Sequence, residues 1–363
     1  MPQEENHKRR VHYSGKYPKN FKEKYKELNP EKYSDTVEHV MKKGSTPAGM
    51  HISIMVREIL DILKIQPGET GFDATLGYGG HTKAMLECLG GQGHMYATDV
   101  DPIESEKTRK RLAAAGFGED ILTIKLQNFC TIDEIAREAG GFDFILADLG
   151  VSSMQIDDPD RGFSYKNDGP LDLRLNPEAG ISAAQRLDSI SAEELAGMLV
   201  ENSDEPYAEK LALAITGKIR RGQRIDTTRK LYEVIAEALD FLPEKEKKDT
   251  VKKTCQRVFQ ALRIDVNNEF EVLYEFLEKL PGALKPGGRV AILTFHSGED
   301  KLVKRAFKEG LREGVYADAA RDVIRPSAEE CAQNGRARST KLRWAVRAKA
   351  ASPWHELNCT SNY

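Results

Sequence analysis

Apolar residues first recur with a regular period near residue 51. Ile52, Met55, Ile59 and Leu63 follow helical spacing and stop before the Pro67-Gly68 pair, which predicts an amphipathic helix. Short apolar stretches then alternate with segments of helical periodicity. The expected strands lie at 70–75, 95–98, 121–126 and 142–147, and the expected helices lie near 81–89, 102–114 and 131–138. Strands and helices that alternate over short loops indicate a doubly wound, mainly parallel α/β sheet.

Residues 156–250 interrupt this alternation. They open with a polar run, Asp157-Asp158-Pro159-Asp160-Arg161-Gly162, and continue with helical patterns at 181–201, 205–220 and 227–240, without a convincing strand. The sheet pattern then resumes with a long helix over 259–280, a turn at Lys285-Pro286-Gly287-Gly288, and strands over 289–295 and 341–346. We therefore expect an α/β domain made of residues 46–155 and 251–350, with 156–250 as a helical insertion.

Charge is unevenly distributed along the 363 residues, whose net charge is −3. Residues 1–43 hold 11 Lys/Arg against 7 Asp/Glu, and residues 301–350 hold 13 against 6, so basic ends flank an acidic middle. A polyanion-binding surface would show this distribution, and so would a solvated charged surface. Residues 1–45 contain few aliphatic side chains, so we expect a basic N-terminal arm, and 351–363 form a C-terminal tail.

Composition argues against several classes of protein. No apolar run approaches the roughly 18–20 residues that span a bilayer. The first residues contain no apolar segment typical of a secretory signal, so we expect a cytoplasmic protein without a membrane partner. The five cysteines form no Cys-x-x-Cys pair, which favours reduced thiols over a disulfide framework or a structural zinc, and no metal site is predicted.

The sharpest signal for a ligand is the glycine cluster in Asp73-Ala74-Thr75-Leu76-Gly77-Tyr78-Gly79-Gly80-His81, between an expected strand and a helix. Glycines let a ligand approach the backbone closely, and a helix start offers free N–H groups to an anionic end. Asp99, at the end of the next strand, is placed to accept hydrogen bonds from ribose hydroxyls. These features indicate a nucleoside-containing cofactor.

The spacing of the glycines bears on the identity of that cofactor. The sixth position counted from Gly77 is Thr82, so the dinucleotide pattern G-x-G-x-x-G is absent, as is the G-K-[ST] of a phosphate-binding loop. A site for S-adenosylmethionine needs glycines that let the ligand approach the backbone and a protein carboxylate that binds the ribose hydroxyls. It does not need a loop that binds a pyrophosphate. We favour S-adenosylmethionine over a nicotinamide or flavin nucleotide and over an ordinary tight turn.

Two further strand ends carry polar residues, and ligands of open α/β sheets bind at the carboxyl ends of the strands. Asp148 opens the stretch Asp148-Leu149-Gly150-Val151-Ser152-Ser153 after the fourth strand, and His296 follows the fifth. Asp148 is either a residue of the reacting centre or a helix or turn cap. His296 is either a crevice residue or a structural histidine.

Charged and aromatic residues gather in the first loop of the insertion, at Arg161, Phe163, Asp172 and Arg174. Arginine can pair with phosphate and aromatic rings can stack on unpaired bases, which is how looped RNA is usually read. A polar loop with a buried phenylalanine would contain the same residues.

Together these segments resemble the MraW (RsmH) family of S-adenosylmethionine-dependent methyltransferases, which act on N4 of a cytidine in bacterial small-subunit rRNA. The match covers roughly residues 50–348 and includes one long, family-specific stretch. The matching stretches are DATLGYGGHT (73–82), DVDP (99–102), DLGVSS (148–153), QIDDPDRGFSYKNDGPLDLR (155–174), FQALRI (259–264), LKPGGR (284–289), FHS (295–297) and RSTKLR (338–343).

The resemblance implies a Rossmann-like class I methyltransferase fold with an insertion that recognises RNA. It implies 16S rRNA or the small ribosomal subunit as partner and a cytosine of the decoding centre as target. A family-like homodimer has no support in the sequence itself. The implied cofactor contacts are Gly79, Gly80, His81, Asp99, Phe129, Asp148 and Gln155, with Phe129 beside the adenine and Asp148 and Gln155 near the methyl group.

For the chemistry, our hypothesis is that Asp148, with Ser152 or Ser153, accepts a hydrogen bond from the cytosine amine. The residues expected to contact RNA are Arg161, Phe163, Asp172, Arg174 and His296. Three alternatives stay open: a same-family enzyme acting on another RNA cytosine, a nucleotide-dependent oxidoreductase on the same scaffold, and a non-catalytic ribosome-assembly factor.

The chain departs from the family pattern mostly outside the cofactor half. Met154, Cys255-Gln256, Gly298 and Gly335 replace the usual proline, Ala-Thr, leucine and proline, and Ser203-Asp204-Glu205-Pro206 replaces Gly-Glu-Glu-Arg. The N-terminal arm has no counterpart in a typical member. The chain therefore looks like a divergent paralogue with an N-terminal extension.

Overall fold

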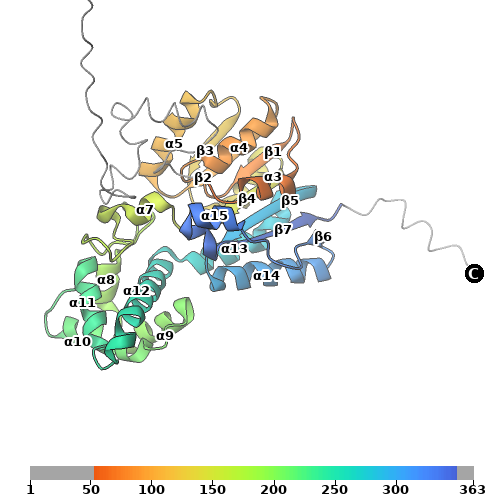
Figure 1. Cartoon of the computed structure of the whole chain (residues 1–363). Helices are drawn as coiled ribbons and strands as arrows, with labels where there is room; N and C mark the ends of the chain where they lie inside the picture. Colours follow the sequence, from red (N-terminus) through yellow and green to blue (C-terminus); the bar gives the residue numbers. More distant parts are fainter. Residues whose placement is uncertain (1–52, 350–363) are drawn as a thin grey trace, which may run out of the picture. The chain divides into compact units, whose positions relative to one another are not determined.

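A seven-stranded sheet organises residues 53–349, the part of the chain that the computed structural model describes (Figure 1). Its strands are β1 (Thr70–Asp73), β2 (His94–Asp99), β3 (Leu122–Leu126), β4 (Phe142–Asp148), β5 (Leu284–Thr294), β6 (Tyr316–Ala319) and β7 (Lys341–Arg347). The predicted arm and tail, 1–45 and 351–363, lie outside the described residues.

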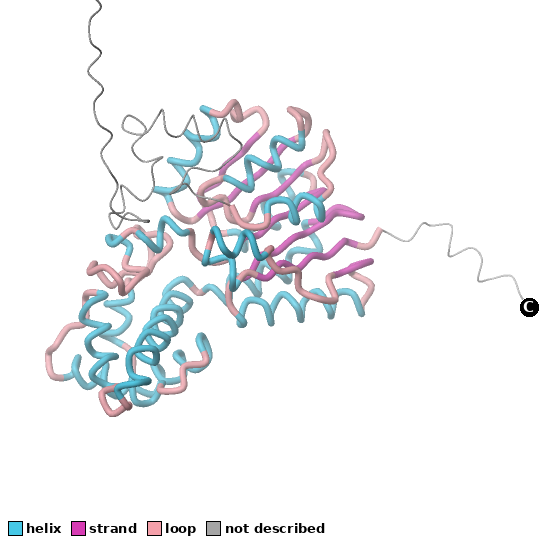
Figure 2. The backbone as a smooth tube through the Cα atoms, in the orientation of Figure 1, coloured by secondary structure: helices cyan, strands magenta, loops and turns pink. Residues whose placement is uncertain are grey.

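The strand order is β3-β2-β1-β4-β5-β7-β6, and the strands lie side by side in Figure 2. The first five pair in parallel, and β7 runs antiparallel to both β5 and β6. The prediction of a doubly wound, mainly parallel α/β sheet is confirmed, as is the last strand near 341–346. The reversal of order at β1 and β4 creates the crevice in which such folds bind ligands.

Helices cover the two faces of the sheet with separate apolar cores. Along β4, Phe144 and Leu146 pack in one core, and Ile145 and Ala147 pack in the other, because successive strand residues point to opposite faces. The first core includes α3 (Val56–Leu63), α4 (Gly80–Leu89) and α5 (Pro102–Ala114); the second includes α6 (Ile132–Ala139), α13 (Glu269–Ala283) and α14 (Ser297–Arg312).

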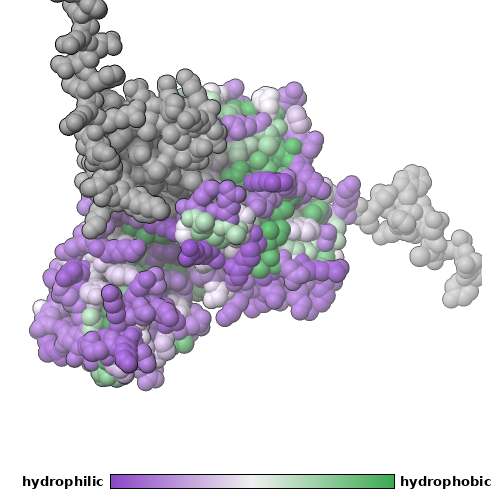
Figure 3. Space-filling model, viewed as in Figure 1, coloured by the Kyte–Doolittle hydropathy of each residue, from purple (hydrophilic) through white to green (hydrophobic). Residues whose placement is uncertain are grey.

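Residues 153–267 form the helices α7 (Ser153–Asp157), α8 (Ala183–Ser189), α9 (Ala192–Ser203), α10 (Ala208–Arg220), α11 (Thr228–Ala238) and α12 (Glu244–Asn267). A third apolar cluster, from Phe163 to Leu262, holds α8 to α12 together as the group seen in Figure 1. Hydrophilic residues cover most of the face of this group that Figure 3 shows. The helix predicted over 181–201 is in fact two helices, because Ser191 accepts the Glu194 N–H and starts α9.

Three other predictions differ from the structure. The turn expected at 285–288 lies inside β5, where the pairing register with β4 shifts between Phe142 and Phe144. The helix expected over 259–280 is divided at Asn268, whose φ of 50° ends α12 and begins α13. Asparagine adopts this left-handed conformation more readily than most residues. The short edge strand β6 was not predicted, since four residues give too little alternation to identify it.

Two further findings concern the described residues alone. Their four cysteines, Cys88, Cys130, Cys255 and Cys331, are free thiols. Across residues 53–349, every helix is too short or too polar to traverse a bilayer. The short helices α15 (Ala328–Gln333), η2 (Phe129–Thr131), η3 (Pro159–Arg161) and η4 (Gly335–Ser339) complete the fold.

Candidate active site

The carboxyl ends of β1, β2 and β4 meet at one edge of the sheet, where the glycine cluster connects β1 to α4. Asp73 at the end of β1 is 1% exposed and accepts the Thr75 N–H at 3.0 Å and the Thr82 hydroxyl at 2.6 Å. Burial raises the pKa of Asp73. This buried carboxylate therefore holds both ends of the glycine loop, at Thr75 and at Thr82. The sequence alone did not indicate this role.

Gly79 and Gly80 both stand where a side chain has no room. Gly79 has a φ of 81°, and a Cβ there would lie 2.6 Å from Thr108 Cγ2. A Cβ on Gly80 would lie 2.0 Å from Ser53 Oγ. The left-handed backbone at Gly79 starts α4, so the free N–H groups of that helix face the crevice.

Asp99 lies at the end of β2, beside the glycine loop. Its Oδ2 accepts the Gly77 N–H at 2.8 Å and its Oδ1 accepts the Asp101 N–H at 2.9 Å. Burial raises the pKa of Asp99 to about 6, while these two hydrogen bonds oppose the shift. Each carboxylate oxygen retains a second lone pair, so the group can still accept from two adjacent hydroxyls.

Asp148 ends β4 and faces His81 on α4. The Asp148 N–H donates to Thr75 Oγ1 at 2.7 Å, and Asp148 Oδ2 lies 3.4 Å from His81 Nδ1. Within residues 53–349, the buried Oδ1 has no hydrogen-bond partner. Burial raises the pKa of Asp148 to about 6, and the charge of His81 opposes the shift.

A proton is required between Asp148 and His81. His81 Nε2 lies 2.9 Å from the Ile54 carbonyl oxygen, which can only accept, so Nε2 carries the hydrogen. In a neutral ring, Nδ1 then carries a lone pair, and this lone pair faces the Asp148 carboxylate. The 3.4 Å contact is favourable only when either Nδ1 or the carboxyl group is protonated.

Helix α7, which follows β4, places Ser152 and Gln155. Ser152 Oγ accepts the Gln155 N–H at 3.2 Å and Gln155 Oε1 accepts the Ser152 N–H at 2.9 Å, which is a capping box. Ser152, rather than Asp148, is thus the cap in this stretch. Gln155 Nε2 donates to Asp101 Oδ2 at 2.9 Å. Ser153 is the first residue of α7.

Phe129 begins η2 (Phe129–Thr131), directly after β3. Its ring is half-buried and meets Phe276 of α13 edge to face, with 5.2 Å between the ring centroids. One side of the Phe129 ring is therefore fixed by packing against the core that α6, α13 and α14 form on one face of the sheet.

The first loop of the insertion holds its charged residues in internal contacts. Arg161 is 9% exposed and donates to Asp101 Oδ2 at 2.7 Å, and Phe163 belongs to the core of the helical group. Arg174 pairs with Asp172 at 2.7 and 2.8 Å and also donates to the Ala179 and Gly180 carbonyls. The structure therefore gives Arg161 and Phe163 packing roles and leaves the Asp172–Arg174 pair partly accessible.

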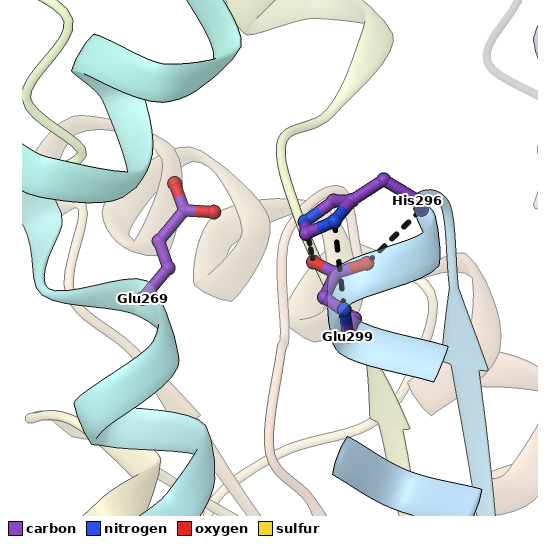
Figure 4. A group of neighbouring side chains, drawn as sticks. All are labelled: Glu269, His296 and Glu299. Carbon is purple, nitrogen blue, oxygen red and sulfur yellow. Dashed lines mark hydrogen bonds and ion pairs between the residues drawn. The ribbon is translucent and has the colours of Figure 1, made fainter. Parts of the chain in front are cut away.

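His296 caps α14 and is held by Glu299 (Figure 4). His296 Nδ1 faces the Glu299 N–H at 3.5 Å, and His296 Nε2 lies 3.1 Å from Glu299 Oε1. Glu299 is 3% exposed; burial opposes its ionisation, but the hydrogen bond and charge of His296 lower its pKa. The ring of Phe270 lies 5.6 Å from that of His296, so the histidine is fixed on two sides.

Glu269, His296 and Glu299 each bring a ligand atom within 4.8 Å of the others, a spacing that a cation could bridge (Figure 4). Both Glu269 oxygens, however, accept from Arg263, each at 2.8 Å. A guanidinium therefore already supplies positive charge to this group.

Two residues that sequence reasoning did not select connect the parts of the site. Asp101 is fully buried and joins Gln155 to Arg161, and Glu299 orients His296. Asp101 belongs to the stretch DVDP, where proline at the start of α5 after an aspartate is the signature of an N-cap. The N-cap signature accounts for the contacts of Asp101 Oδ1. It does not indicate that Oδ2 binds Gln155 and Arg161.

Comparisons with known proteins agree with this geometry. The family model described as the MraW methylase family matches residues 48–348. The chain is 80% identical to "Ribosomal RNA small subunit methyltransferase H 1" of Agathobacter rectalis, over 96% of this chain and all of that protein. It is 39% identical to "Ribosomal RNA small subunit methyltransferase H" of Thioalkalivibrio sulfidiphilus, over 83% of this chain and 98% of that one. The first match extends into the N-terminal arm.

Among solved structures, the chain is similar to one titled as a putative rRNA-methylase from Clostridium thermocellum. The identity is 12% and the TM-score 0.42, with 82% of this chain and all of that chain covered. The fold assignment rests on the strand order described above, and the family assignment rests on the family model and the high sequence identities. The chain belongs to the MraW methylase family.

Proposed function

We propose that this chain transfers the methyl group of S-adenosylmethionine to the exocyclic N4 amine of a cytosine in the decoding centre of 16S rRNA. The observation that carries the proposal is Asp148 Oδ1, a buried carboxylate oxygen without a hydrogen-bond partner in residues 53–349, at the carboxyl end of β4. Family membership and the relatives named as small-subunit rRNA methyltransferases support it.

The residues at the crevice fit S-adenosylmethionine. A Cβ on Gly79 would meet Thr108 and one on Gly80 would meet Ser53, so the loop beside α4 keeps its shape only with glycine at both positions. The Asp99 carboxylate stands where ribose hydroxyls need an acceptor. In this proposal Phe129 flanks the adenine, Asp148 and Gln155 lie near the methyl group, and His81 is a further cofactor contact. The cofactor supplies an electrophilic methyl group on a positively charged sulfur.

Catalysis then consists largely of positioning the acceptor amine. In-line transfer needs the nitrogen about 3–3.5 Å from the methyl carbon. The cytosine amine is a weak nucleophile because its lone pair is shared with the ring, and its nitrogen gains positive character in the transition state. In the carboxylate form, Asp148 Oδ1 accepts an N–H of that amine, stabilises the charge and would take the proton that the nitrogen loses once the N–C bond has formed and the C–S bond has broken. Ser152 or Ser153 completes the acceptor set.

The remaining assignments concern RNA. We assign residues 46–155 and 251–350 to the methyltransferase domain and 156–250 to RNA recognition, with α12 running across the junction at 250. The Asp172–Arg174 pair and His296 would contact RNA directly, whereas Arg161 and Phe163 would act by holding the loop. A target base must be unstacked to enter, at a cost of a few kcal/mol that is smaller in a loop than in a duplex. We place the reaction in the cytoplasm, and light scattering decides between monomer and homodimer.

The test is methyl transfer from labelled S-adenosylmethionine to small subunits and to naked 16S rRNA from a strain that lacks this enzyme. The modified nucleoside is then identified by mass spectrometry. N4-methylcytidine in the decoding centre supports the proposal. The same nucleoside elsewhere would overturn the assigned target, and cofactor binding without transfer to either RNA would overturn the acceptor.

A further inference from the structure

Asp101 is a fully buried carboxylate that the proposed chemistry does not use. It caps α5: its Oδ1 accepts the N–H groups of Ile103 at 3.0 Å and Glu104 at 3.2 Å. Capping needs only this one oxygen. The second oxygen is therefore free for another purpose.

That second oxygen joins two parts of the chain that are distant in sequence. Asp101 Oδ2 accepts Gln155 Nε2 at 2.9 Å and Arg161 Nη1 at 2.7 Å. Asp101 and Arg161 are 0% and 9% exposed, so the charges meet away from water. A buried ion pair is weak support for stability because desolvation offsets attraction, but it fixes the relative position of the elements that carry it.

Arg161 also holds the first loop of the insertion. Its Nη2 donates to the Leu175 carbonyl at 2.9 Å and to the Arg174 carbonyl at 3.2 Å. From α12, Asn267 donates to the Leu173 carbonyl and accepts the Leu175 N–H, both at 2.8 Å. Leu173, between these clamps, is buried and has a φ of 64°. A leucine is strained there, and the two clamps are among the contacts that hold the loop in this shape.

On its other side, Asp101 is attached to the cofactor crevice. Its N–H donates to Asp99 Oδ1 at 2.9 Å, and Asp99 Oδ2 accepts the Gly77 N–H at 2.8 Å. An unbroken series of hydrogen bonds thus runs from the glycine loop through Asp99, Asp101 and Arg161 to Leu175. A ligand that binds the Asp99 carboxylate would restrict the movement of Asp99, which connects the glycine loop to Asp101.

Resting on the proposed function, we infer that the buried Asp101–Arg161 pair couples the cofactor crevice to the loop 161–175, so that bound cofactor strengthens RNA binding. Asp101 and Arg161 are positioning residues in this inference, since both are buried and act through Asp99 and the loop carbonyls. By thermodynamic linkage, RNA must then strengthen cofactor binding by the same factor.

The test uses the full chain, S-adenosylhomocysteine and an RNA hairpin with the decoding-centre sequence. The dissociation constant of each ligand is measured with and without the other. In the unaltered chain both should fall by the same factor, at least about fivefold. In Arg161→Lys the charge stays, but the planar fork that reaches Asp101 and the two carbonyls is lost, so the factor should approach one.

Arg289→Lys is the matched control. Arg289, in the middle of β5, pairs with Glu69 through two contacts of 2.8 Å; Glu69 directly precedes β1, so this pair lies at the amino end of β1, away from the carboxyl ends that form the crevice. This variant loses a comparable guanidinium fork and should keep the full coupling factor. A purely structural role for Arg161 would lower its melting temperature and leave the coupling factor unchanged, which would overturn the inference.

Amide hydrogen exchange on the unaltered chain keeps the inference testable if Arg161→Lys does not fold. S-adenosylhomocysteine alone should slow exchange in residues 161–175 and leave the edge strand β6 unchanged. No slowing in the loop overturns the coupling. Failure of the unaltered chain to methylate small-subunit RNA would instead overturn the proposed function, so the two failures are distinguishable.

Discussion

Asp148 Oδ2 lies 3.4 Å from His81 Nδ1, and the Ile54 carbonyl fixes the hydrogen of that ring on the other nitrogen. A proton between Asp148 Oδ2 and His81 Nδ1 makes this contact favourable, and Asp148 Oδ1 accepts from an amine most strongly when the side chain is the carboxylate. His81 comes from the start of α4 and Asp148 from the end of β4, so the glycine loop sets their separation.

The first prediction concerns Asp148→Asn. The amide keeps the size of the side chain but removes the charge that faces the cytosine amine, so kcat should fall by about 10²–10³-fold. Single-turnover methylation of RNA measures the loss, and calorimetric titration with S-adenosylhomocysteine should show binding retained. Full single-turnover activity in this variant would contradict the role given to Asp148.

The second prediction is a pH dependence. Burial raises the pKa of Asp148 to about 6, so the carboxylate form, which best stabilises positive charge on the amine nitrogen, grows as pH rises through about 6. The single-turnover rate should rise over that range and level off above it. For stability the sign is opposite: the protonated form favours the folded state, and this contribution is lost as pH rises from the ordinary value of 3.8 to about 6.

Asp99 also has a pKa raised to about 6 by burial, so cofactor affinity must be separated from chemistry. Saturating cofactor at each pH leaves the rate to report the reacting centre. A flat rate between pH 5 and 8 under saturation would be inconsistent with the second prediction.

The third prediction compares Gly79→Ala with Gly90→Ala. Both glycines have positive φ at opposite ends of α4, 81° and 58°, but a Cβ meets Thr108 Cγ2 at 2.6 Å only at Gly79. Both variants should lose about 1–3 kcal/mol of unfolding free energy through backbone strain. Only Gly79→Ala should also weaken S-adenosylhomocysteine binding, as measured by calorimetry. If both variants bound S-adenosylhomocysteine equally well, the glycine loop would not be part of the cofactor site.

The fourth prediction concerns Phe163, which is 8% exposed in the core of the helical group. Phe163→Ala should lower the free energy of unfolding by about 3–5 kcal/mol, the usual cost of truncating a core phenylalanine. Phe241→Ala is the control, since that ring is 57% exposed in the same group, and it should cost less than about 1 kcal/mol. Denaturant unfolding measures both. Weakened RNA binding without lost stability would show that Phe163 is a contact residue after all.

Much of the fold could be predicted from periodicity, because the alternation along β4 and the helical stripes follow from burial on both faces of a sheet. The break at Asn268 could not, since a single left-handed residue leaves the surrounding helical pattern intact. Motifs placed Gly79, Asp99 and Asp148 at the crevice. They could not show that Arg161 is buried against Asp101, because that pair joins residues 60 apart in sequence.

Helix α12 is one 24-residue rod, about 36 Å long at 1.5 Å per residue. Its far end packs among the insertion's helices, and its near end carries Asn267, which clamps the loop, and stops at the left-handed Asn268. If α12 pivots as a rigid body at Asn268, a tilt of about 10° moves its far end by about 6 Å. A large RNA bound to the insertion would thereby apply torque to the loop that Asn267 clamps.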